Sequence, residues 1–254
     1  MKLSVVIPVF NEKATVATIV DRVRAVDLPL EIIVVDDGST DGTREVLRAI
    51  ESRVDTVILL DRNRGKGAAL KAGFAAATGD VVVIQDADLE YDPQDYLALL
   101  DPILKADADL VLGSRFIRGG RVENYPPFKL AVNRAANLFI RVLFRLSYND
   151  VTNAFKAYRA SVIRGRGPFL SAQFNLTVEL PPKAIVRGYS DEVVPISWRQ
   201  REVGISSLRL REMGSRYLFI VVYLWLERLL TGGDYRRSDG EAFTPWTPPG
   251  TGSA

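Results

Sequence analysis

Short runs of β-branched and other apolar residues alternate with amphipathic segments through the first 115 residues. The runs have the composition of strands buried on both faces, whereas the segments between them repeat apolar residues at helical spacing, as at Val16, Ile19 and Val23. Strands that alternate with helices at short spacing form right-handed βαβ units, which predicts an α/β fold with a mainly parallel sheet flanked by helices. Strands are expected at 3–8, 31–36, 56–60, 81–84 and 109–113, and helices at 14–26, 40–50, 65–77 and 93–104.

The pattern changes after about residue 115. Further helices are expected at 128–148 and 172–187, then a strand at 193–198 and an apolar, aromatic segment at 217–230. That last segment is shorter than the roughly 20 apolar residues that a membrane span needs, so we expect an interfacial or oligomer-forming helix. Residues 232–254 are rich in Gly, Pro, Ser and Thr, which predicts a disordered tail after a folded domain at 1–231.

The segment 128–148 is basic on one side and apolar on the other. At 100° per residue, Arg134, Arg141 and Arg145 fall within about 40° of each other. Such a helix can lie in a membrane interface, or it can be an ordinary surface helix packed on the core, and the sequence leaves both interpretations open. The opposite arc carries Val132, Ala135, Phe139, Val142, Leu143 and Leu146.

An acidic stretch, Gln85-Asp86-Ala87-Asp88-Leu89-Glu90, follows the apolar run at 81–84. A buried parallel strand should end at the carboxyl edge of its sheet, where open α/β sheets hold their ligands. Asp86 and Asp88 would point to the same side of a continuing strand and would repel unless a cation lay between them. Hard oxygen ligands at this spacing suit Mg²⁺ or Mn²⁺ holding a diphosphate. The alternative is a solvated acidic loop that caps the next helix at Asp92-Pro93.

Composition narrows the chemistry. The 254 residues are 47% hydrophobic and 25% charged with a net charge of +2, which fits a globular protein without a nucleic-acid signature. The chain has no cysteine and no histidine, so carboxylates, arginine, lysine and a bound ion must carry any reaction. No Gly-x-Gly-x-x-Gly follows the first strand and no Walker A sequence is present, which disfavours classical dinucleotide and P-loop sites. The absence of a signal-peptide pattern predicts a cytoplasmic protein.

Four motifs occur in a fixed order: Ile7-Pro8-Val9-Phe10-Asn11-Glu12, Val35-Asp36-Asp37-Gly38-Ser39-Thr40-Asp41-Gly42-Thr43, Gly65-Lys66-Gly67 with Gly73 and Gly79-Asp80, and Asp86-Ala87-Asp88. Together they closely resemble glycosyltransferase family 2, the GT-A (Rossmann-like) enzymes that use nucleotide sugars. The later blocks Gly113-Ser114-Arg115-Phe116, Asn133-Arg134-Ala135-Ala136-Asn137, Thr152-Asn153-Ala154-Phe155-Lys156-Ala157-Tyr158-Arg159, Arg187-Gly188-Tyr189 and Val194-Pro195-Ile196-Ser197-Trp198 resemble its dolichol-phosphate mannose synthase branch. The resemblance implies a nucleotide-sugar half at 1–115 and an acceptor and membrane-interface half at 116–231.

The resemblance implies a nucleotide site where the first two strands end. A base can rest on the sheet edge beside Pro8 and Phe10, and Glu12 suits hydrogen bonding to the nucleoside. Asp36 and Asp37 could accept from a base N–H, or the stretch after them could make only a turn and a helix cap.

Phosphate and metal groups are expected next to that base site. Lys66, between two glycines, can meet phosphate charge or simply begin a helix in solvent. By resemblance, Asp86, Asp88 and Glu90 hold Mg²⁺ or Mn²⁺; the third position is often Gln in the family, so Glu90 is a departure. Asp88 and three arginines that could bind phosphate bidentately, Arg115, Arg134 and Arg201, are the expected catalytic residues; each arginine could instead be an ordinary surface residue.

The implied reaction is an inverting transfer of a hexose from a nucleotide sugar to a polyprenyl phosphate. GDP-mannose is favoured by the branch, and UDP-glucose, UDP-galactose and UDP-N-acetylhexosamines remain open. A phosphate monoester has a second pKa of about 6, so this acceptor needs no strong general base. The lipid acceptor implies docking at the cytoplasmic face of a membrane through 128–148 and 217–230, with a separate membrane-spanning partner or a homo-oligomer left open.

Two other functions are compatible with the same predicted fold. A family 2 enzyme with a saccharide or protein acceptor would need a carboxylate base, for which Glu179 is the candidate, although Glu179 could equally be a charge on a helix face. A nucleotide-sugar-binding scaffold without catalysis is the second rival, and the intact acidic and arginine positions argue against it. A sugar nucleotidyltransferase is disfavoured because no glycine-rich arginine loop follows the first strand.

Overall fold

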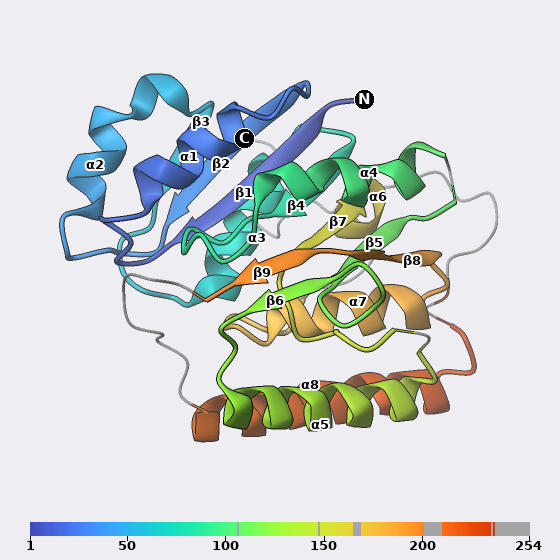
Figure 1. Ribbon diagram of the computed structural model, residues 1–254. Coiled ribbons are helices and arrows are strands. Elements are labelled where there is room, and N and C mark those ends of the chain that lie inside the picture. Colours follow the sequence, from blue (N-terminus) through green and yellow to red (C-terminus); the bar gives the residue numbers. More distant parts are fainter. Residues whose placement is uncertain (106, 147, 165–168, 201–209, 235, 237–254) are drawn as a thin grey trace, which may run out of the picture.

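A central sheet organises the molecule (Figure 1). The computed structural model describes residues 1–105, 107–146, 148–164, 169–200, 210–234 and 236, and within them the sheet has seven strands in the order β3-β2-β1-β4-β7-β5-β8. Neighbouring strands are parallel except at β7, which runs antiparallel to β4 and β5. The strands are β1 (Leu3–Val9), β2 (Leu30–Asp36), β3 (Thr56–Leu59), β4 (Val81–Ile84), β5 (Leu110–Ser114), β7 (Lys156–Arg159) and β8 (Asp191–Pro195).

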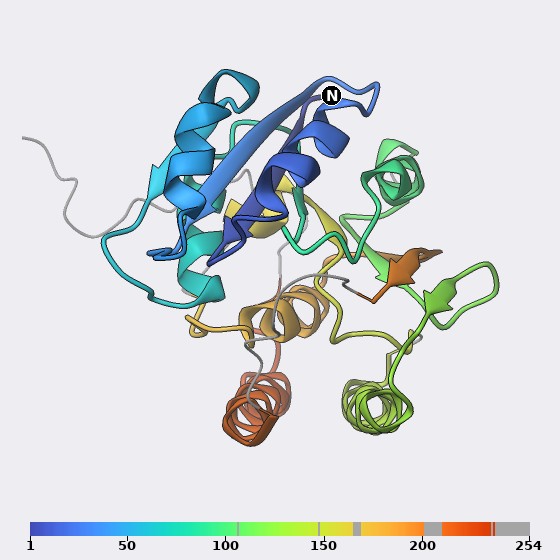
Figure 2. The same cartoon turned by 60° about the vertical axis from the view of Figure 1, so that its left-hand side comes forward.

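Helices cover both faces of this sheet (Figures 1 and 2). One face packs against α1 (Val16–Arg24), α2 (Thr43–Ala49) and α4 (Tyr96–Leu104). The other face packs against α3 (Lys66–Ala76), α6 (Ala160–Arg164) and α7 (Leu176–Val186). Two single-turn 3₁₀ helices lie at Glu51–Arg53 and Pro93–Asp95 within the described chain.

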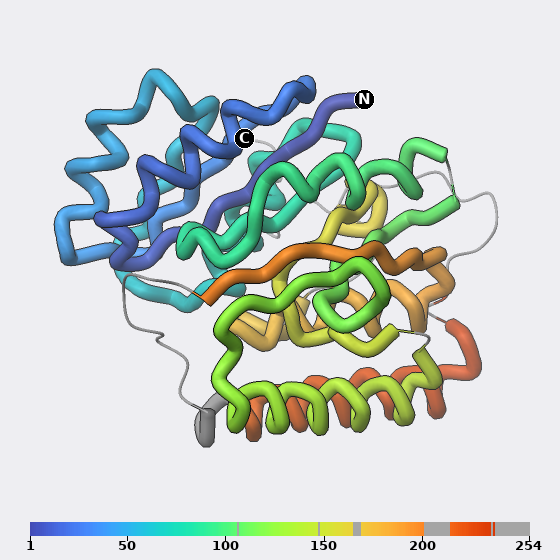
Figure 3. The backbone as a smooth tube through the Cα atoms, viewed as in Figure 1, coloured from blue at the N-terminus to red at the C-terminus, as the bar shows by residue number. Residues whose placement is uncertain are grey.

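Two longer helices form an outer layer. The backbone trace shows α5 (Pro127–Phe144) and α8 (Leu210–Leu230) running along the same side of the molecule, beneath α7 (Figure 3). Viewed nearly end-on, both stand on the side away from α1 and α2 (Figure 2). Helix α8 contacts both α7 and α5.

The core is divided by the sheet because successive strand residues point to opposite faces. Val5 and Ile7 of β1 face α1 and α4, whereas Val6 faces α3. Strands β1, β2 and β4 are therefore apolar at nearly every position, as the continuous apolar runs predicted.

The strand order places a topological switch point between β1 and β4. From β1 the chain builds outward through β2 to β3, and it then returns to the other side of β1 as β4. Loops that leave the carboxyl ends of strands on either side of such a point diverge, and ligands of open α/β sheets bind there. The predicted motifs after β1, β2 and β4 meet at this edge.

The mainly parallel α/β fold is confirmed, with corrections beyond β5. The expected strand at 193–198 is two strands, because the chain leaves β8 at buried Ile196 and enters β9 (Ser197–Arg199), which pairs with β6 (Arg121–Glu123) in a second sheet. The expected helix 128–148 ends at Phe144, because Arg145 adopts a left-handed conformation with φ 54°. Of the predicted disordered tail, residues 235 and 237–254 lie outside the described chain.

Candidate active site

The turn after β2 is built around the buried carboxylate of Asp36. This carboxylate accepts hydrogen bonds from the backbone N–H groups of Gly38 and Ser39 and from Arg44 Nε, the last at 2.7 Å. Gly38 has φ 76°, and a Cβ there would lie 2.5 Å from the Arg62 carbonyl carbon, so only glycine fits. Asp36 therefore shapes the turn, and its predicted contact with a base stays a prediction.

Asp37 joins this turn to the loop before α3. Its two carboxylate oxygens accept from the backbone N–H groups of Arg64 and Gly65, both at 2.7 Å. Burial raises the pKa of Asp37 above its ordinary value, although these two hydrogen bonds oppose the rise. The bonds bring Lys66, the first residue of α3, to the same sheet edge as Asp37.

The predicted residues after β1 also converge here. Asn11 accepts from the Thr40 N–H at 2.9 Å and has φ 57°, while the Glu12 carboxylate accepts from the Thr15 hydroxyl at 2.9 Å. Phe10 is partly exposed at the strand end. The structure thus brings the loops carrying Phe10, Glu12, Asp37 and Lys66 together, as their positions at strand ends predicted.

Lys66 connects the third motif to the fourth. Its ammonium group pairs with the carboxylate of Asp86, and it lies 5.5 Å from the centre of the Phe174 ring. Both side chains of the ion pair are mostly buried. A Cβ on Gly67 would lie 2.7 Å from the backbone of Ala172, which explains the glycine on this side of Lys66. The pair gives the sheet edge a cation and a carboxylate in direct contact.

The acidic turn after β4 does not gather its three carboxylates. Leu89 has φ 63°, a left-handed conformation that turns the chain between Asp88 and Glu90. Asp88 Oδ1 accepts from the Glu90 N–H at 3.1 Å, and Glu90 Oε2 accepts from Trp198 Nε1 at 3.0 Å. Within the described chain no three acidic side chains form a metal-binding group. The predicted Asp86, Asp88 and Glu90 site is therefore not assembled as a triad here, and it stays a prediction.

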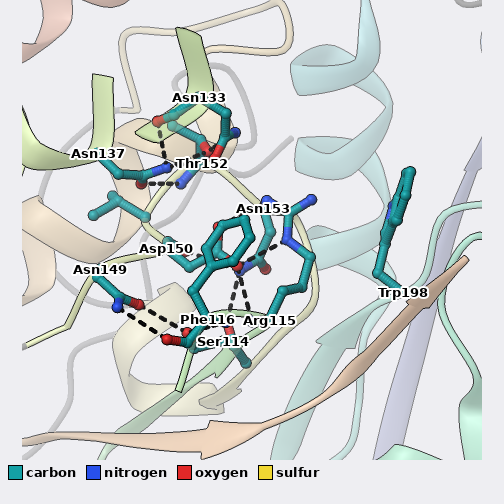
Figure 4. A network of polar contacts seen from close by, with 12 residues as sticks. Ser114, Arg115, Phe116, Asn133, Asn137, Asn149, Asp150, Thr152, Asn153 and Trp198 are labelled. Carbon is teal, nitrogen blue, oxygen red and sulfur yellow. Dashed lines mark hydrogen bonds and ion pairs between the residues drawn. The ribbon is translucent and has the colours of Figure 1, made fainter. Parts of the chain in front are cut away.

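Arg115 is buried and held by Asp150 (Figure 4). Its Nε and Nη2 donate to the two carboxylate oxygens of Asp150 at 2.8 and 2.7 Å, and its backbone N–H donates to the same group at 3.0 Å. The guanidinium carbon lies 5.2, 5.5 and 6.0 Å from the ring centres of Phe116, Tyr125 and Trp198. The predicted phosphate-binding arginine thus has a fixed orientation before any ligand arrives.

Arg134 approaches the same group from α5. Its guanidinium carbon lies 4.9 Å from the centre of the Phe116 ring, so both arginines lie against the same aromatic ring. One turn further along the helix, buried Asn137 donates to Thr152 Oγ1 at 3.1 Å and accepts from the Thr152 N–H at 3.2 Å (Figure 4). Arg201, the third predicted arginine, lies outside the described residues.

Sequence reasoning missed the residues that support these groups. Asp150 orients Arg115, and buried Gln85 donates to the Asp86 carbonyl at 3.1 Å. Lys156 donates to the carbonyls of Val151, Asn153 and Thr177, and burial lowers its pKa to about 7. Asp150 and Lys156 stand in or beside resemblance blocks, but no spacing rule reveals which partner a buried polar residue selects.

Glu179 is poorly suited to act as a base. It is fully buried, and its two carboxylate oxygens accept from the backbone N–H groups of Leu170 and Ser171 at 2.9 and 2.8 Å. Lys183 Nζ pairs with it at 3.0 Å. Burial alone would raise the pKa of Glu179, but hydrogen bonding to Ser171 and the charge of Lys183 lower it. Its contacts are those of a structural carboxylate.

The outer layer exposes large apolar side chains. On α5 the arc opposite the buried Ile140 and Phe144 faces solvent instead of the core, with Phe128 74% and Val142 69% exposed. On α8, Leu218, Phe219, Leu229 and Leu230 are between 53% and 74% exposed. We call these side chains of α5 and α8 the apolar outer face. None of the described helices combines the length and apolarity of a bilayer span.

A mainly parallel sheet with carboxylates, a lysine and an arginine after the carboxyl ends of its strands fits a nucleotide-sugar enzyme of the GT-A class, and comparison with known proteins agrees. The family profile of glycosyl transferase family 2 matches residues 4–167, and the chain belongs to this family. It is 35% identical over 212 residues to polyprenol monophosphomannose synthase of Mycolicibacterium smegmatis, which covers 80% of each chain.

Other relatives extend the comparison. The chain is 30% identical over 215 residues to undecaprenyl-phosphate mannosyltransferase of Micrococcus luteus, which covers 82% of this chain and 88% of that one. It is 34% identical over 170 residues to dolichol-phosphate mannosyltransferase of Pyrococcus furiosus, but that match spans only 48% of the relative. A similar solved structure is glucosyl-3-phosphoglycerate synthase from Mycobacterium tuberculosis with Mn²⁺, UDP-glucose and phosphoglyceric acid, with 25% identity, a TM-score of 0.69, and coverage of 89% and 79%.

Proposed function

We propose that this family 2 glycosyltransferase moves mannose from GDP-mannose to a polyprenyl phosphate at a membrane surface. The relatives at 30–35% identity are named for mannosyl transfer to polyprenyl phosphates. The observation that carries the proposal is that buried Arg115 is linked, through the loop 149–153, to a helix whose outer side is apolar and exposed. An anion-binding group beside a lipid-seeking surface is what a membrane phosphate acceptor requires.

Asp86 and Asp88 would hold the divalent ion. Their carboxylates follow one strand and supply the hard oxygen atoms that Mg²⁺ and Mn²⁺ prefer, and Asp86 already has a cation, Lys66, against it. When bound, the ion would supply positive charge to the leaving diphosphate. Similar structures contain Mn²⁺ or Mg²⁺ together with UDP. Lys66 would add a second positive charge to the diphosphate, and the loops carrying Phe10, Glu12 and Asp37 would hold the nucleoside.

The acceptor chemistry suits the side chains that the site offers. A polyprenyl phosphate is largely dianionic at neutral pH and attacks the anomeric carbon without losing a proton to a protein base. What the protein must do is hold two anionic groups near each other, and Arg115, with Arg134 and Arg201, would do so. One displacement inverts the anomeric centre, so a β-linked product is expected from an α-linked donor. Glu179, with its contacts already filled, does not favour a saccharide acceptor.

Docking would occur on the cytoplasmic side through the apolar outer face. Moving the exposed Phe, Leu and Val side chains of α5 and α8 into the lipid interface lowers the free energy by roughly 25 cal/mol per Å² of buried apolar surface. A membrane-spanning partner or a second copy of this chain would compete for that same face. Vesicle binding by the isolated protein distinguishes lipid from either protein occupant.

The test is sugar transfer into organic-extractable lipid. Polyprenyl phosphate, Mg²⁺ or Mn²⁺ and labelled GDP-mannose, UDP-glucose, UDP-galactose or UDP-N-acetylhexosamines are supplied in parallel. We expect label in the lipid only from GDP-mannose, and a loss of at least about 100-fold in Asp88→Ala, because the divalent ion that would neutralise the leaving diphosphate loses a ligand. Transfer from a UDP-sugar instead would correct the donor. Nucleotide binding without any lipid label would overturn the acceptor assignment.

A further inference from the structure

Three consecutive residues of β9 bond to the segment between β4 and α4, two of them to Glu90 in the acidic turn and one to Asp95 at the start of α4. The Ser197 N–H donates to Asp95 Oδ2 at 2.9 Å, Trp198 Nε1 donates to Glu90 Oε2 at 3.0 Å, and the Arg199 N–H donates to the Glu90 carbonyl at 3.0 Å. Glu90 therefore uses its side chain and its backbone carbonyl on the same strand. Its position is determined by β9 as much as by β4.

Trp198 faces the arginine as well as the carboxylate. Its side chain is buried, its ring centre lies 4.6 Å from that of Tyr125, and both rings stand within 6.0 Å of the Arg115 guanidinium carbon. A buried indole N–H needs an acceptor, and an ionised carboxylate is a strong one. The bond to Glu90 thus fixes the plane of the ring that borders Arg115.

We infer that Glu90 and Trp198 form a positioning pair for the transfer reaction, in which Glu90 holds Trp198 against Arg115 and leaves the metal to Asp86 and Asp88. The inference rests on the proposed function and assigns Glu90 a role different from that of a third metal ligand. Two observations favour it. Leu89, between Asp88 and Glu90, is left-handed and turns the chain there, and the three carboxylates do not form one group in the described chain. The Glu90 side chain points to the indole at hydrogen-bonding distance.

The pair would act on acceptor placement. Asp150 fixes Arg115 from one side, while the rings of Tyr125 and Trp198 border its guanidinium group. If the Trp198 ring rotated, Arg115 would lose one of the two aromatic rings that border its guanidinium group. A phosphate bound to Arg115 would then shift relative to the sugar. A displacement of about 1 Å in a reacting group is enough to slow a reaction about 100-fold.

Two independent measurements test the inference on full-length protein. The first is Mn²⁺ binding in the presence of GDP, followed by the electron paramagnetic resonance of free Mn²⁺. We expect Asp88→Ala to weaken Mn²⁺ binding more than about tenfold, and Glu90→Ala and Trp198→Phe to remain within about threefold of wild type. Trp198→Phe keeps an aromatic ring and removes the N–H donor. If Glu90→Ala loses Mn²⁺ as Asp88→Ala does, Glu90 is a metal ligand and the inference is wrong.

The second measurement is the rate of mannose transfer to polyprenyl phosphate. Glu90→Ala and Trp198→Phe should each lower it about tenfold or more, and the double variant should be no slower than the slower single variant, because both remove one interaction. Glu90→Gln keeps an acceptor for the indole and should recover most of the rate lost in Glu90→Ala. The inference would be wrong if the fold-losses in transfer rate of the two single variants multiplied in the double variant. It would also be wrong if Trp198→Phe transferred mannose at the wild-type rate.

The two proposals fail in different ways. If wild type transfers no sugar to polyprenyl phosphate, the proposed function is wrong and the pair falls with it. If wild type transfers sugar but Asp88→Ala binds Mn²⁺ normally, the metal assignment is wrong, while the pair is still decided by the transfer rates. Thermal unfolding of each variant separates a lost fold from a lost rate, since only a folded variant with normal Mn²⁺ binding and slow transfer supports positioning.

Discussion

At the scale of single residues, the ion pair between Arg115 and Asp150 is almost completely buried. Both side chains are at most 5% exposed, and two parallel hydrogen bonds join them. A buried charge whose partner is removed keeps its desolvation cost without its compensation. We expect Asp150→Asn to lower the free energy of unfolding by about 3–5 kcal/mol, measured by urea denaturation.

A surface pair supplies the matched control for that change. Arg199 and Glu123 also form a 2.8 Å bond, but their side chains are 66% and 52% exposed. Glu123→Gln should therefore cost less than about 1 kcal/mol in the same experiment. If both variants lost the same free energy of unfolding, burial would not determine how much the Arg115–Asp150 pair contributes to stability.

Glu31, at the opposite end of the sheet from the site, limits the stability of the protein in acid. Burial alone would raise its pKa, but hydrogen bonds from Lys2, Ser4 and Thr78 outweigh burial and lower the pKa to about 2. Since the folded value lies below the ordinary 4.5, its stabilisation is complete above pH 4.5 and is lost as the pH falls towards 2.

We expect the free energy of unfolding of Glu31→Gln to fall less steeply than that of wild type as the pH decreases below 4.5. Wild type should lose on the order of 3 kcal/mol between pH 4.5 and 2 through this one group, at ~1.4 kcal/mol per pH unit, and the variant should lose that much less. Urea denaturation at stepped pH measures both. Glu45→Gln, which alters an exposed pair with Arg48, is the control. Parallel acid limbs in wild type and Glu31→Gln would contradict the assignment.

At the scale of elements, α5 and α8 carry a testable surface. Leu138 and Val142 of α5 are 58% and 69% exposed, so replacing both with Glu should change the free energy of unfolding by less than about 1 kcal/mol. On the proposed function, the same change should weaken sedimentation with anionic vesicles at least about tenfold.

A substitution on another helix provides the comparison. Leu104, in the last turn of α4, is 61% exposed and lies outside the apolar outer face, so Leu104→Glu should bind vesicles as wild type does. If the α5 double variant also binds as wild type does, the membrane contact lies elsewhere. If wild type does not bind vesicles, the proposed docking through the apolar outer face is wrong.

The elements that sequence could predict are those whose burial is uniform. The run at 81–84 gave β4 with the same bounds, because four apolar residues are buried there on both faces. Strand β7 was missed because Lys156 and Arg159 at its ends look like surface residues, although Lys156 is fully buried. The division of 193–198 into two strands was missed because both strands and the buried Ile196 between them read as one continuous run.

At the scale of the whole molecule, chain topology explains what could be predicted of the site. Motifs that follow parallel strands must meet at one sheet edge, which brought Asp37, Lys66 and Asp86 together as expected. Which groups pair within that edge depends on side-chain directions in loops. The sequence therefore could not predict that Asp36 would bind Arg44, or that Glu90 would bind Trp198.

The contact between Asn137 and Thr152 has a geometric consequence. A prenyl phosphate cannot rise far from the head groups without pulling its chain into water. On the proposed function, the height of Arg115 above the bilayer would therefore decide whether Arg115 reaches the phosphate. Asn137 joins α5 to the loop that carries Asp150, and Asp150 holds Arg115. If α5 rests in the interface, the depth to which it enters the lipid would set the height of Arg115 relative to the head groups, and so the level at which the enzyme meets its substrate.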